Sequence, residues 1–337
     1  MEQPTNGLIG SKWLFVGGAG YIGSHVLREF ESAGADCFVF DNLITGIESR
    51  VPTSVPLVRG DASNSTQVVD ACNEFEINGI VHLAAHMQAR ESVRNPVKFW
   101  ENNLGATLGI TKNLGRTKVN HVIFSSSCSI YGNVRAATTE SPLQPLSPYA
   151  FTKVASEQVL TQACDENDVR LSILRYFNVI GCGEFNSSFD HSVETLLPAS
   201  AKHILAGKSP KIFGGNFSTP DGTALRDYLD VRDLARVHRL IASSDGISKR
   251  QVLNVSSGIP ISVKTILGLL LNISGTHLEP EVVPAKLGDP AEVWATPSSE
   301  LLEMGWSPEF SVEDSVRDFW NASLAKGDGD SLTDGRK

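Results

Sequence analysis

The sequence predicts an α/β fold in which a doubly wound parallel sheet is joined to a second, smaller and discontinuous α/β lobe. Three observations lead to this prediction. In the first half of the chain, short apolar runs alternate with amphipathic stretches of helical length, as they do in β-α-β units. A glycine-rich turn joins the first apolar run to the first helical stretch. After Asn178 the regular alternation is lost, which indicates a change of architecture.

The first β-α unit contains a glycine turn of the kind that binds dinucleotides. An apolar run over residues 13–16 is predicted to be a buried strand, and an amphipathic stretch over 21–33 is predicted to be a helix. The turn between them carries Gly17 and Gly20, and Gly23 follows in the helix. Gly17 permits the tight turn, Gly20 lets the backbone approach a pyrophosphate, and Gly23 lets helix and strand pack closely. The helix N-terminus then offers free N–H groups and a partial positive charge to the phosphates.

Asp41 supports the same interpretation. It ends a second apolar run, residues 37–40, and it lies about 20 residues beyond the glycines, where an acid that binds the adenosine ribose is expected. Its carboxylate would bond the ribose hydroxyls and repel a 2′-phosphate, so the sequence favours NAD over NADP. The alternative, an aspartate that only begins a turn, is less favoured in this setting.

The rest of the first half extends the predicted sheet. With the first two strands it makes about six parallel strands, and a ligand is expected at their carboxyl ends. The further strands are expected over residues 56–61, 78–85, 119–124 and 170–177, and the helices over 63–75, 96–114 and 148–164.

The second half is expected to build the smaller lobe and to return to the sheet. Its expected elements are a loop over 181–190, a helix over 193–206 despite Pro198, a short strand over 211–214, residues 226–231 before a helix that ends near Ser243, a strand over 252–255, a helix over 262–273, and a last helical region flanked by 293–296 and 306–308. We therefore expect a Rossmann-type NAD-binding domain over 12–180, with returning segments over about 226–258, a substrate-binding lobe over 181–225 and 259–325, and a flexible tail over 326–337.

Composition excludes several classes of protein. The chain has 337 residues and a net charge of −9, which argues against a general nucleic-acid binder. No apolar run approaches the ~20 residues that span a membrane, and the polar N-terminus is unlike a signal peptide. Five scattered cysteines show no metal-binding spacing, so we expect no metal. Their odd number suits reduced thiols, and we expect a cytoplasmic protein.

A second motif points to acid–base chemistry. Ser147 and Pro148 are good first residues of a helix, which places Tyr149 and Lys153 four apart on one helix face. A tyrosine that is half phenolate at pH 7 needs its pKa lowered by roughly 3 units, or about 4 kcal/mol. An ammonium about 4 Å away supplies an effect of that size at an effective dielectric constant near 20. Tyr149 is thus predicted to be a general base, with Lys153 as its electrostatic partner.

These assignments have plainer alternatives. Tyr-x-x-x-Lys alone is a weak motif, and two solvated helix residues would explain it. Ser127 ends a predicted strand and could relay a proton between Tyr149 and a substrate hydroxyl, whereas Ser125 and Ser126 are equally well explained as a polar exit from the strand.

Together these motifs resemble the extended short-chain dehydrogenase/reductases, and more narrowly the UDP-glucose (UDP-galactose) 4-epimerase family. The resemblance runs from about Lys12 to Trp320. The motifs that carry it are Gly17 to Gly23, Asp41-Asn42, Ser125-Ser126-Ser127 with Tyr131-Gly132, Tyr149 to Lys153, Arg175 to Asn178, and Asp221-Gly222-Thr223 with Arg226-Asp227-Tyr228.

The resemblance implies an isomerase of the UDP-sugar 4-epimerase class that holds NAD tightly and acts in carbohydrate metabolism, including galactose metabolism. Tyr149 would take the proton of the sugar 4-hydroxyl, directly or through Ser127, while the C4 hydride passes to nicotinamide. The 4-keto sugar would then turn over and receive the hydride on its other face. The implied substrates are UDP-glucose and UDP-galactose.

The resemblance also implies a set of site residues. Tyr21 and Ile22 would meet the pyrophosphate, Asp61 and Ala62 the adenine, and Tyr176 the nicotinamide. The full cofactor set is Gly17, Gly20, Tyr21, Ile22, Gly23, Asp41, Asn42, Asp61, Ala62, Leu83, Ala84, Ala85, Asn102, Tyr149, Lys153 and Tyr176. The substrate set is Ser127, Asn178, Leu196, Phe213, Arg226, Lys286, Asp289 and Val293, in which Asn178 and Arg226 would bind the diphosphate and Leu196, Phe213 and Asp289 the uridine.

Arg226 has its own argument, because a guanidinium is the preferred bidentate partner of phosphate. The alternative for Arg226 is a structural ion pair with Asp227 or Asp230.

Four positions depart from the family pattern. Met87 stands where the family has a lysine, Thr195 where it has an asparagine, and Lys286 where it has an arginine. Val293 replaces a pocket tyrosine beside the sugar. This last change is expected to enlarge the sugar site, so that UDP-GlcNAc and UDP-GalNAc fit as well.

Other functions stay open at this point. A UDP-glucuronate 4-epimerase or decarboxylase and a UDP-pentose 4-epimerase use the same 4-keto chemistry. The 4,6-dehydratases match less well, because they carry Thr-Asp-Glu where this chain has residues 127–129. A non-catalytic NAD-binding sensor is the alternative outside enzymes. The family also implies a homodimer, for which the helices over 96–114 and 148–164 are the candidates.

Overall fold

A parallel sheet of seven strands forms the larger part of the computed structural model, which describes residues 7–183, 195–244, 248–286 and 289–327. The strand order is β11-β7-β5-β4-β1-β2-β3, and every neighbouring pair is parallel. The strands are β1 (Lys12–Val16), β2 (Asp36–Asp41), β3 (Leu57–Arg59), β4 (Gly79–His82), β5 (His121–Ser127), β7 (Arg170–Tyr176) and β11 (Arg250–Val255). The predicted doubly wound sheet is therefore confirmed, with β11 as its seventh strand.

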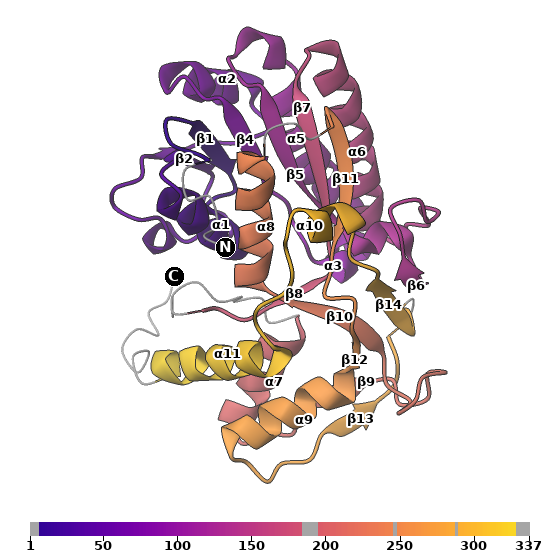
Figure 1. Cartoon of the computed structure of the whole chain (residues 1–337). Coiled ribbons are helices and arrows are strands. Elements are labelled where there is room, and N and C mark those ends of the chain that lie inside the picture. Colours follow the sequence, from indigo (N-terminus) through magenta and orange to yellow (C-terminus); the bar gives the residue numbers. More distant parts are fainter. Residues whose placement is uncertain (1–6, 184–194, 245–247, 287–288, 328–337) are drawn as a thin grey trace.

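Helices cover both faces of this sheet (Figure 1). Because successive side chains of a strand point to opposite faces, Trp13 and Phe15 pack with one set of helices and Leu14 and Val16 with the other. The first set is α1 (Tyr21–Ser32), α8 (Val231–Ser243) and α10 (Ser299–Glu303). The second is α2 (Ser65–Glu74), α5 (Gly105–Thr111) and α6 (Pro148–Glu166).

A smaller part lies below the carboxyl ends of the strands (Figure 1). Its five-stranded sheet has the order β12-β10-β14-β6, and β8 pairs with β10. These strands are β6 (Val134–Ala137), β8 (Asn178–Ile180), β10 (Leu225–Asp230), β12 (Pro260–Ser262) and β14 (Glu292–Ala295), and a separate pair joins β9 (Lys211–Phe213) to β13 (Glu281–Val283).

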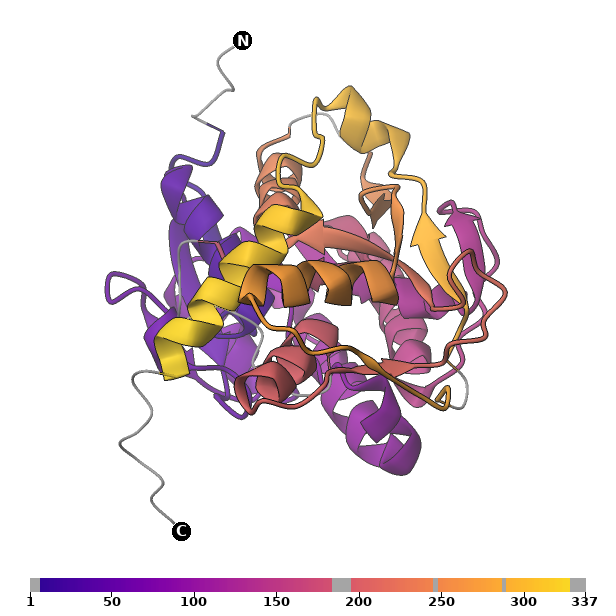
Figure 2. The ribbon, with the colours of Figure 1, turned by 90° about the horizontal axis from the view of Figure 1, so that it is seen from below.

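Three helices close this lower part. They are α7 (Leu196–Leu205), α9 (Val263–Ser274) and α11 (Val312–Gly327). Figure 2 shows α9 and α11 side by side across the bottom, where Ile266 and Leu270 share a buried cluster with Val316 and Phe319. No helix among the described residues is long and apolar enough to span a membrane.

The predicted helix over 96–114 is not continuous. It consists of α4 (Pro96–Phe99), a wider π turn over Trp100–Leu104, and α5, and the short helix α3 (Ala89–Arg94) precedes it. π turns occur often at functional sites. This one contains Asn102, which lines the cavity described below, and Asn103, whose side chain accepts from His86 N and donates to His86 O.

The C-terminal prediction was wrong in one respect. Helix α11 was not anticipated, and it extends to Gly327, so the predicted tail begins inside a helix. Residues 328–337 lie outside the described part of the chain. So do residues 184–194, which hold most of the predicted loop over 181–190 and the first two residues of the predicted helix over 193–206.

Three buried histidines are expected to make stability fall in acid. Burial lowers the pKa of His82 to about 3, of His121 to about 3 and of His238 to about 4. Between pH ~6.5 and these values the unfolded chain binds more protons than the folded one, so the free energy of unfolding falls as the pH is lowered through this range.

Urea unfolding at pH 7.5 and pH 5.0 measures this effect. His121→Gln is expected to reduce the difference between the two pH values, whereas the exposed His277→Gln leaves it unchanged. Equal free energies at the two pH values for the wild type would contradict the prediction.

Candidate active site

One cavity of about 1140 Å³ lies at the carboxyl ends of the parallel strands and reaches down to α7, β9 and β10. Its walls come from segments that are distant in sequence, because the ends of parallel strands meet at one edge of a sheet. The glycine turn lines one region of the cavity, Tyr149 and Lys153 line another, and Phe213 and Arg226 line a third.

The glycine turn is shaped by close backbone contacts. Gly17 has φ +87°, and a Cβ atom there would lie 2.6 Å from Ala84 N. A Cβ at Gly23 would lie 2.5 Å from Gly17 O. Helix α1 begins after Gly20 with no side-chain cap on its N–H groups. Free N–H groups at a helix N-terminus beside an open cavity fit the pyrophosphate of a dinucleotide.

Asp41 ends β2 at the same region of the cavity. Its carboxylate accepts from Ala19 N at 3.0 Å and from Leu43 N at 2.9 Å, which fixes the orientation of the side chain. Burial raises the pKa of Asp41, and these two N–H groups oppose that shift. The position fits the predicted contact with the adenosine ribose.

Tyr149 is held at the N-terminus of α6. Ser147 Oγ accepts from Ala150 N at 3.2 Å and caps the helix, and Tyr149 N donates to Ser92 Oγ at 3.1 Å. The side chain of Ser127 lies near the Tyr149 hydroxyl and opposes the rise in its pKa. The structure therefore places the predicted base and the predicted proton relay near each other in one cavity.

The predicted effect of Lys153 on Tyr149 stays a prediction. The Lys153 ammonium donates to Ser125 O at 2.7 Å, and its Nζ lies 5.9 Å from the centroid of the Tyr149 ring. Burial raises the pKa of Tyr149 to about 12 and lowers the pKa of Lys153 to about 8. Burial thus opposes ionisation of Tyr149 in the protein alone, and a further positive charge beside Tyr149 would favour the phenolate.

A buried ion pair supports this region from behind. Arg175 donates to both carboxylate oxygens of Glu157, at 3.1 Å and 2.8 Å, and its Nη1 donates to the Tyr131 hydroxyl at 2.8 Å. Glu157 also accepts from the Ser126 hydroxyl, and its charge favours protonated Lys153 one turn earlier in α6. Ser126 therefore does more than provide a polar end to the strand, as the sequence suggested, because it also binds Glu157.

Arg226 forms an ion pair, but with neither Asp227 nor Asp230, the two partners that the sequence left open. Its Nη2 donates to Asp289 Oδ1 at 2.8 Å and to Pro290 O at 2.7 Å. Asp227 instead accepts from residues 257–258, and Asp230 pairs with Arg232. Arg226 and Asp289 both line the cavity, so this pair belongs to the site.

Most of the predicted site residues line this one cavity. They are Gly17, Gly20, Tyr21, Ile22, Gly23, Asp41, Asn42, Leu83, Ala84, Ala85, Asn102, Ser127, Tyr149, Lys153, Tyr176, Asn178, Leu196, Phe213, Arg226, Lys286 and Asp289. Met87 and Thr195, two of the departures from the family pattern, line it as well.

Three predicted residues do not line it. Asp61 is exposed and accepts from the N–H and hydroxyl of Ser63, and Ala62 is buried in the core beside α5. Val293 is buried in a small cluster with Phe177 and Ala295, so the larger sugar site expected from the loss of the family tyrosine stays a prediction.

Sequence reasoning also missed residues that the fold brings to the cavity. Arg90, Cys128, Phe177 and His203 line it. Only Cys128 had a usable signal, since it follows Ser127 directly. Arg90 looks like any surface arginine of a short helix until the fold places α3 beside α6.

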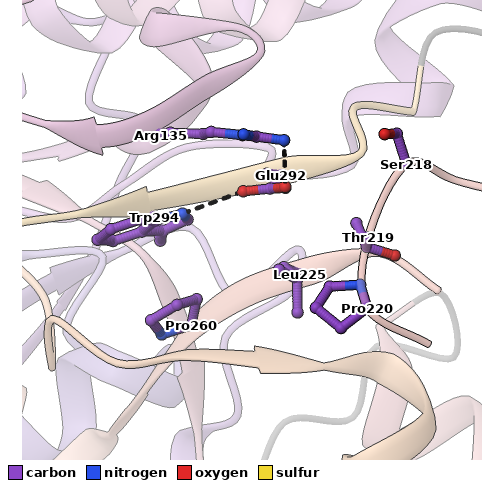
Figure 3. Close-up of a pocket in the computed structure, with 8 residues that line it drawn as sticks. All are labelled: Arg135, Ser218, Thr219, Pro220, Leu225, Pro260, Glu292 and Trp294. Carbon is purple, nitrogen blue, oxygen red and sulfur yellow. Dashed lines mark hydrogen bonds and ion pairs between the residues drawn. The ribbon is translucent and has the colours of Figure 1, made fainter. Parts of the chain in front are cut away.

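A second pocket of about 520 Å³ lies on the outer side of β10 and β14 (Figure 3). Its two charged residues neutralise each other, because Arg135 pairs with Glu292 at 2.7 Å. Trp294 also donates to Glu292, at 3.4 Å. This pocket holds none of the predicted site residues.

Comparison with known proteins agrees with the geometry. Residues 13–256 match the sequence model of the NAD dependent epimerase/dehydratase family. The chain is 34% identical to a UDP-glucose 4-epimerase of Corynebacterium glutamicum over 322 residues, which cover 94% of this chain and 97% of that protein.

Solved structures agree as well. A UDP-glucose-4-epimerase from Stenotrophomonas maltophila, with bound NAD and formylated UDP-arabinopyranose, superposes with a TM-score of 0.88 at 28% identity over 95% of this chain and 99% of that one. The UDP-Glc/GlcNAc 4-epimerase of Campylobacter jejuni gives a TM-score of 0.79 at 32% identity over 94% of this chain and 100% of that one. The chain therefore belongs to the NAD dependent epimerase/dehydratase family.

Proposed function

We propose that this protein is an isomerase that interconverts the C4 epimers of UDP-hexoses, UDP-glucose and UDP-galactose first, with NAD as its cofactor. The observation that carries the proposal is a single cavity that joins a dinucleotide-binding glycine turn to the Ser127–Tyr149 pair and to Arg226. The relatives named UDP-glucose 4-epimerase support it.

The residues that would hold NAD are those of the glycine turn, with Asp41 at the adenosine ribose and Tyr176 near the nicotinamide. NAD, when bound, supplies the group that accepts and returns a hydride at C4 of the sugar. We propose that residues 12–180, together with the returning segments over about 226–258, form the domain that binds NAD. Residues 181–225 and 259–325 would form the lobe that binds the UDP-sugar.

The chain's own residues would move the proton. The ionised phenolate oxygen of Tyr149 would accept the proton of the sugar 4-hydroxyl, directly or through Ser127, and would return it after the sugar has turned. Lys153, with a pKa of about 8, is protonated at neutral pH and contributes part of the positive field that Tyr149 needs. Its bond to Ser125 O keeps the ammonium in place.

The substrate's nucleotide would bind at the opposite end of the cavity. Arg226 would turn part of its guanidinium from Asp289 to the diphosphate, because a doubly charged anion competes well with one carboxylate. Lys286 would add a point charge where the family has an arginine. Phe213 offers a half-exposed ring to the uracil.

A product assay tests the proposal. Purified protein is incubated separately with UDP-glucose, UDP-GlcNAc and UDP-glucuronate, with no added cofactor, and the products are separated by chromatography. Formation of a C4 epimer supports the proposal, and the fastest substrate identifies the sugar. Loss of carbon dioxide from UDP-glucuronate would favour a decarboxylase, and no product even with NAD supplied would remove the epimerase assignment.

We also propose that the protein is a homodimer through the helices over 96–114 and 148–164. Val97, Trp100, Leu108 and Phe151 expose 64%, 37%, 48% and 49% of their surfaces there. Such apolar side chains on neighbouring helices suit a second copy of the same surface.

The dimer is expected to dissociate when its apolar surface is charged. In light scattering after gel filtration, the wild type should have the mass of two chains and the double variant Trp100→Glu/Phe151→Glu the mass of one. Leu205→Glu, which charges an equally exposed leucine on α7, should leave the mass unchanged. A monomeric wild type would refute the dimer.

A cytoplasmic location is proposed on the state of the cysteines. All five are free thiols, and four of them are buried, which suits a reducing compartment.

A further inference from the structure

Arg90 is a cation at the cavity wall that the proposed chemistry does not use. It stands in the first turn of α3, its side chain is exposed, and its guanidinium carbon lies 5.7 Å from the centroid of the Phe213 ring. Among the described residues nothing makes a hydrogen bond or an ion pair with Arg90. Arg226, by contrast, is engaged by Asp289, and Lys153 by Ser125 O.

The backbone beneath Arg90 is well fixed. Ser92, two residues later, is fully buried and accepts from Tyr149 N, and it donates to Ala89 O. Asn103 holds the preceding segment through both backbone groups of His86. The Arg90 side chain therefore extends from a rigid base beside Tyr149, across the cavity, to Phe213.

Phe213 belongs to the other side of the cavity. It ends β9, which pairs only with β13 among the described strands. Lys286 Nζ also contacts its ring, 3.1 Å from the centroid. The ring is thus in contact with one cation from the larger part of the fold and one from the smaller part.

We propose that Arg90 is the second wall of a stacking site for the pyrimidine base, with Phe213 as the first. This inference rests on the proposed function, because it concerns the nucleotide of the same substrate. A guanidinium is planar and stacks on bases, as aromatic rings do. A flat base between two walls needs a separation of about 7 Å, or two van der Waals contact distances of about 3.5 Å. The side chain of Arg90 would need to withdraw by only about 1 Å from its present 5.7 Å.

This arrangement has a functional consequence. Because α3 packs against the N-terminus of α6, a base held by Arg90 is tied to the element that carries Tyr149. The base would then join the two parts of the molecule around the sugar. Arg90 acts on binding and makes no contact with the reacting atoms.

Calorimetric binding of UMP and UDP tests the proposal in four proteins: wild type, Arg90→Ala, Arg90→Lys and Arg94→Ala. Both Arg90 variants are expected to weaken UMP and UDP alike, by roughly five-fold, because lysine keeps the charge but not the plane. Arg94→Ala removes an exposed arginine from the same helix, outside the cavity, and should bind as the wild type does. In the epimerase assay, the Arg90 variants should raise KM and leave kcat unchanged.

Other results would overturn the stacking site. Wild-type affinity in Arg90→Ala would show that the base does not use this side chain. A loss confined to UDP, or full rescue by lysine, would make Arg90 a phosphate ligand. A loss seen only in turnover of UDP-glucuronate would make it a ligand of the sugar carboxylate. If the wild type binds UDP but shows no epimerase activity, the proposed reaction is refuted, and UMP binding by the Arg90 variants still decides whether the stacking site exists. If the wild type binds neither nucleotide, both the proposed reaction and the stacking site are refuted.

Discussion

Replacement of Tyr149 by phenylalanine is expected to lower kcat roughly a thousand-fold, since general acid–base groups contribute about 10²–10⁴. The hydroxyl that is removed is the one beside Ser127. The ring and the backbone bond from Tyr149 N to Ser92 stay, so the fold and UDP binding are expected to be unchanged. Turnover of UDP-glucose, UDP affinity and the melting temperature measure these three quantities in one preparation.

Ser127→Ala tells whether the proton passes through the serine. If Ser127 relays it, this variant should lose nearly as much activity as Tyr149→Phe. If Tyr149 reaches the sugar hydroxyl directly, the loss should be about ten-fold or less. Activity of Tyr149→Phe within ten-fold of the wild type would exclude Tyr149 as the base, and unchanged function of that variant in the cell would favour the NAD-binding sensor.

The glycine turn and Asp41 could be predicted from sequence because their requirements are local. Gly17 has a positive φ and Gly23 lies too close to Gly17 O for a Cβ atom, so both positions require glycine. The spacing of the glycines in the sequence therefore predicts the shape of the turn. The spacing of Tyr149 and Lys153 is equally local, since a helix places residues four apart on one face. These parts of the site follow from backbone geometry.

The contacts that could not be predicted are those that only the assembled fold decides. Lys153 could have pointed to Tyr149, but β5 presents Ser125 O to its ammonium. Val293 matched a pocket residue by alignment, yet the register of β14 buries it against Phe177. Arg90 reaches Phe213 only because α3 and β9 meet across the cavity. None of these contacts has a signature in the neighbouring sequence.

Loss of Arg175 is expected to have the largest effect on stability. Arg175 and Glu157 are 5% and 6% exposed and form a bidentate pair between β7 and α6. Arg175→Ala would leave the Glu157 carboxylate buried without its partner, which typically costs about 3–5 kcal/mol in the free energy of unfolding. Urea unfolding at pH 7.5 measures this cost. Arg250→Ala is the matched control, because its pair with Asp165 joins β11 to the same helix but is about half exposed, and it should cost less than about 1 kcal/mol.

A double variant separates the ion pair from simple packing. If the cost arises from the unpaired carboxylate, Arg175→Met/Glu157→Leu should recover most of the lost stability, because apolar groups of similar size replace a buried pair at little cost. If it arises from lost volume, the single variant Arg175→Met, which restores volume but leaves Glu157 unpaired, should recover as much stability as the double variant. The double variant should still lose activity, since Glu157 also favours the charge of Lys153 and holds Ser126. A stable but slow enzyme would therefore mean that the pair is kept for the site rather than for the fold.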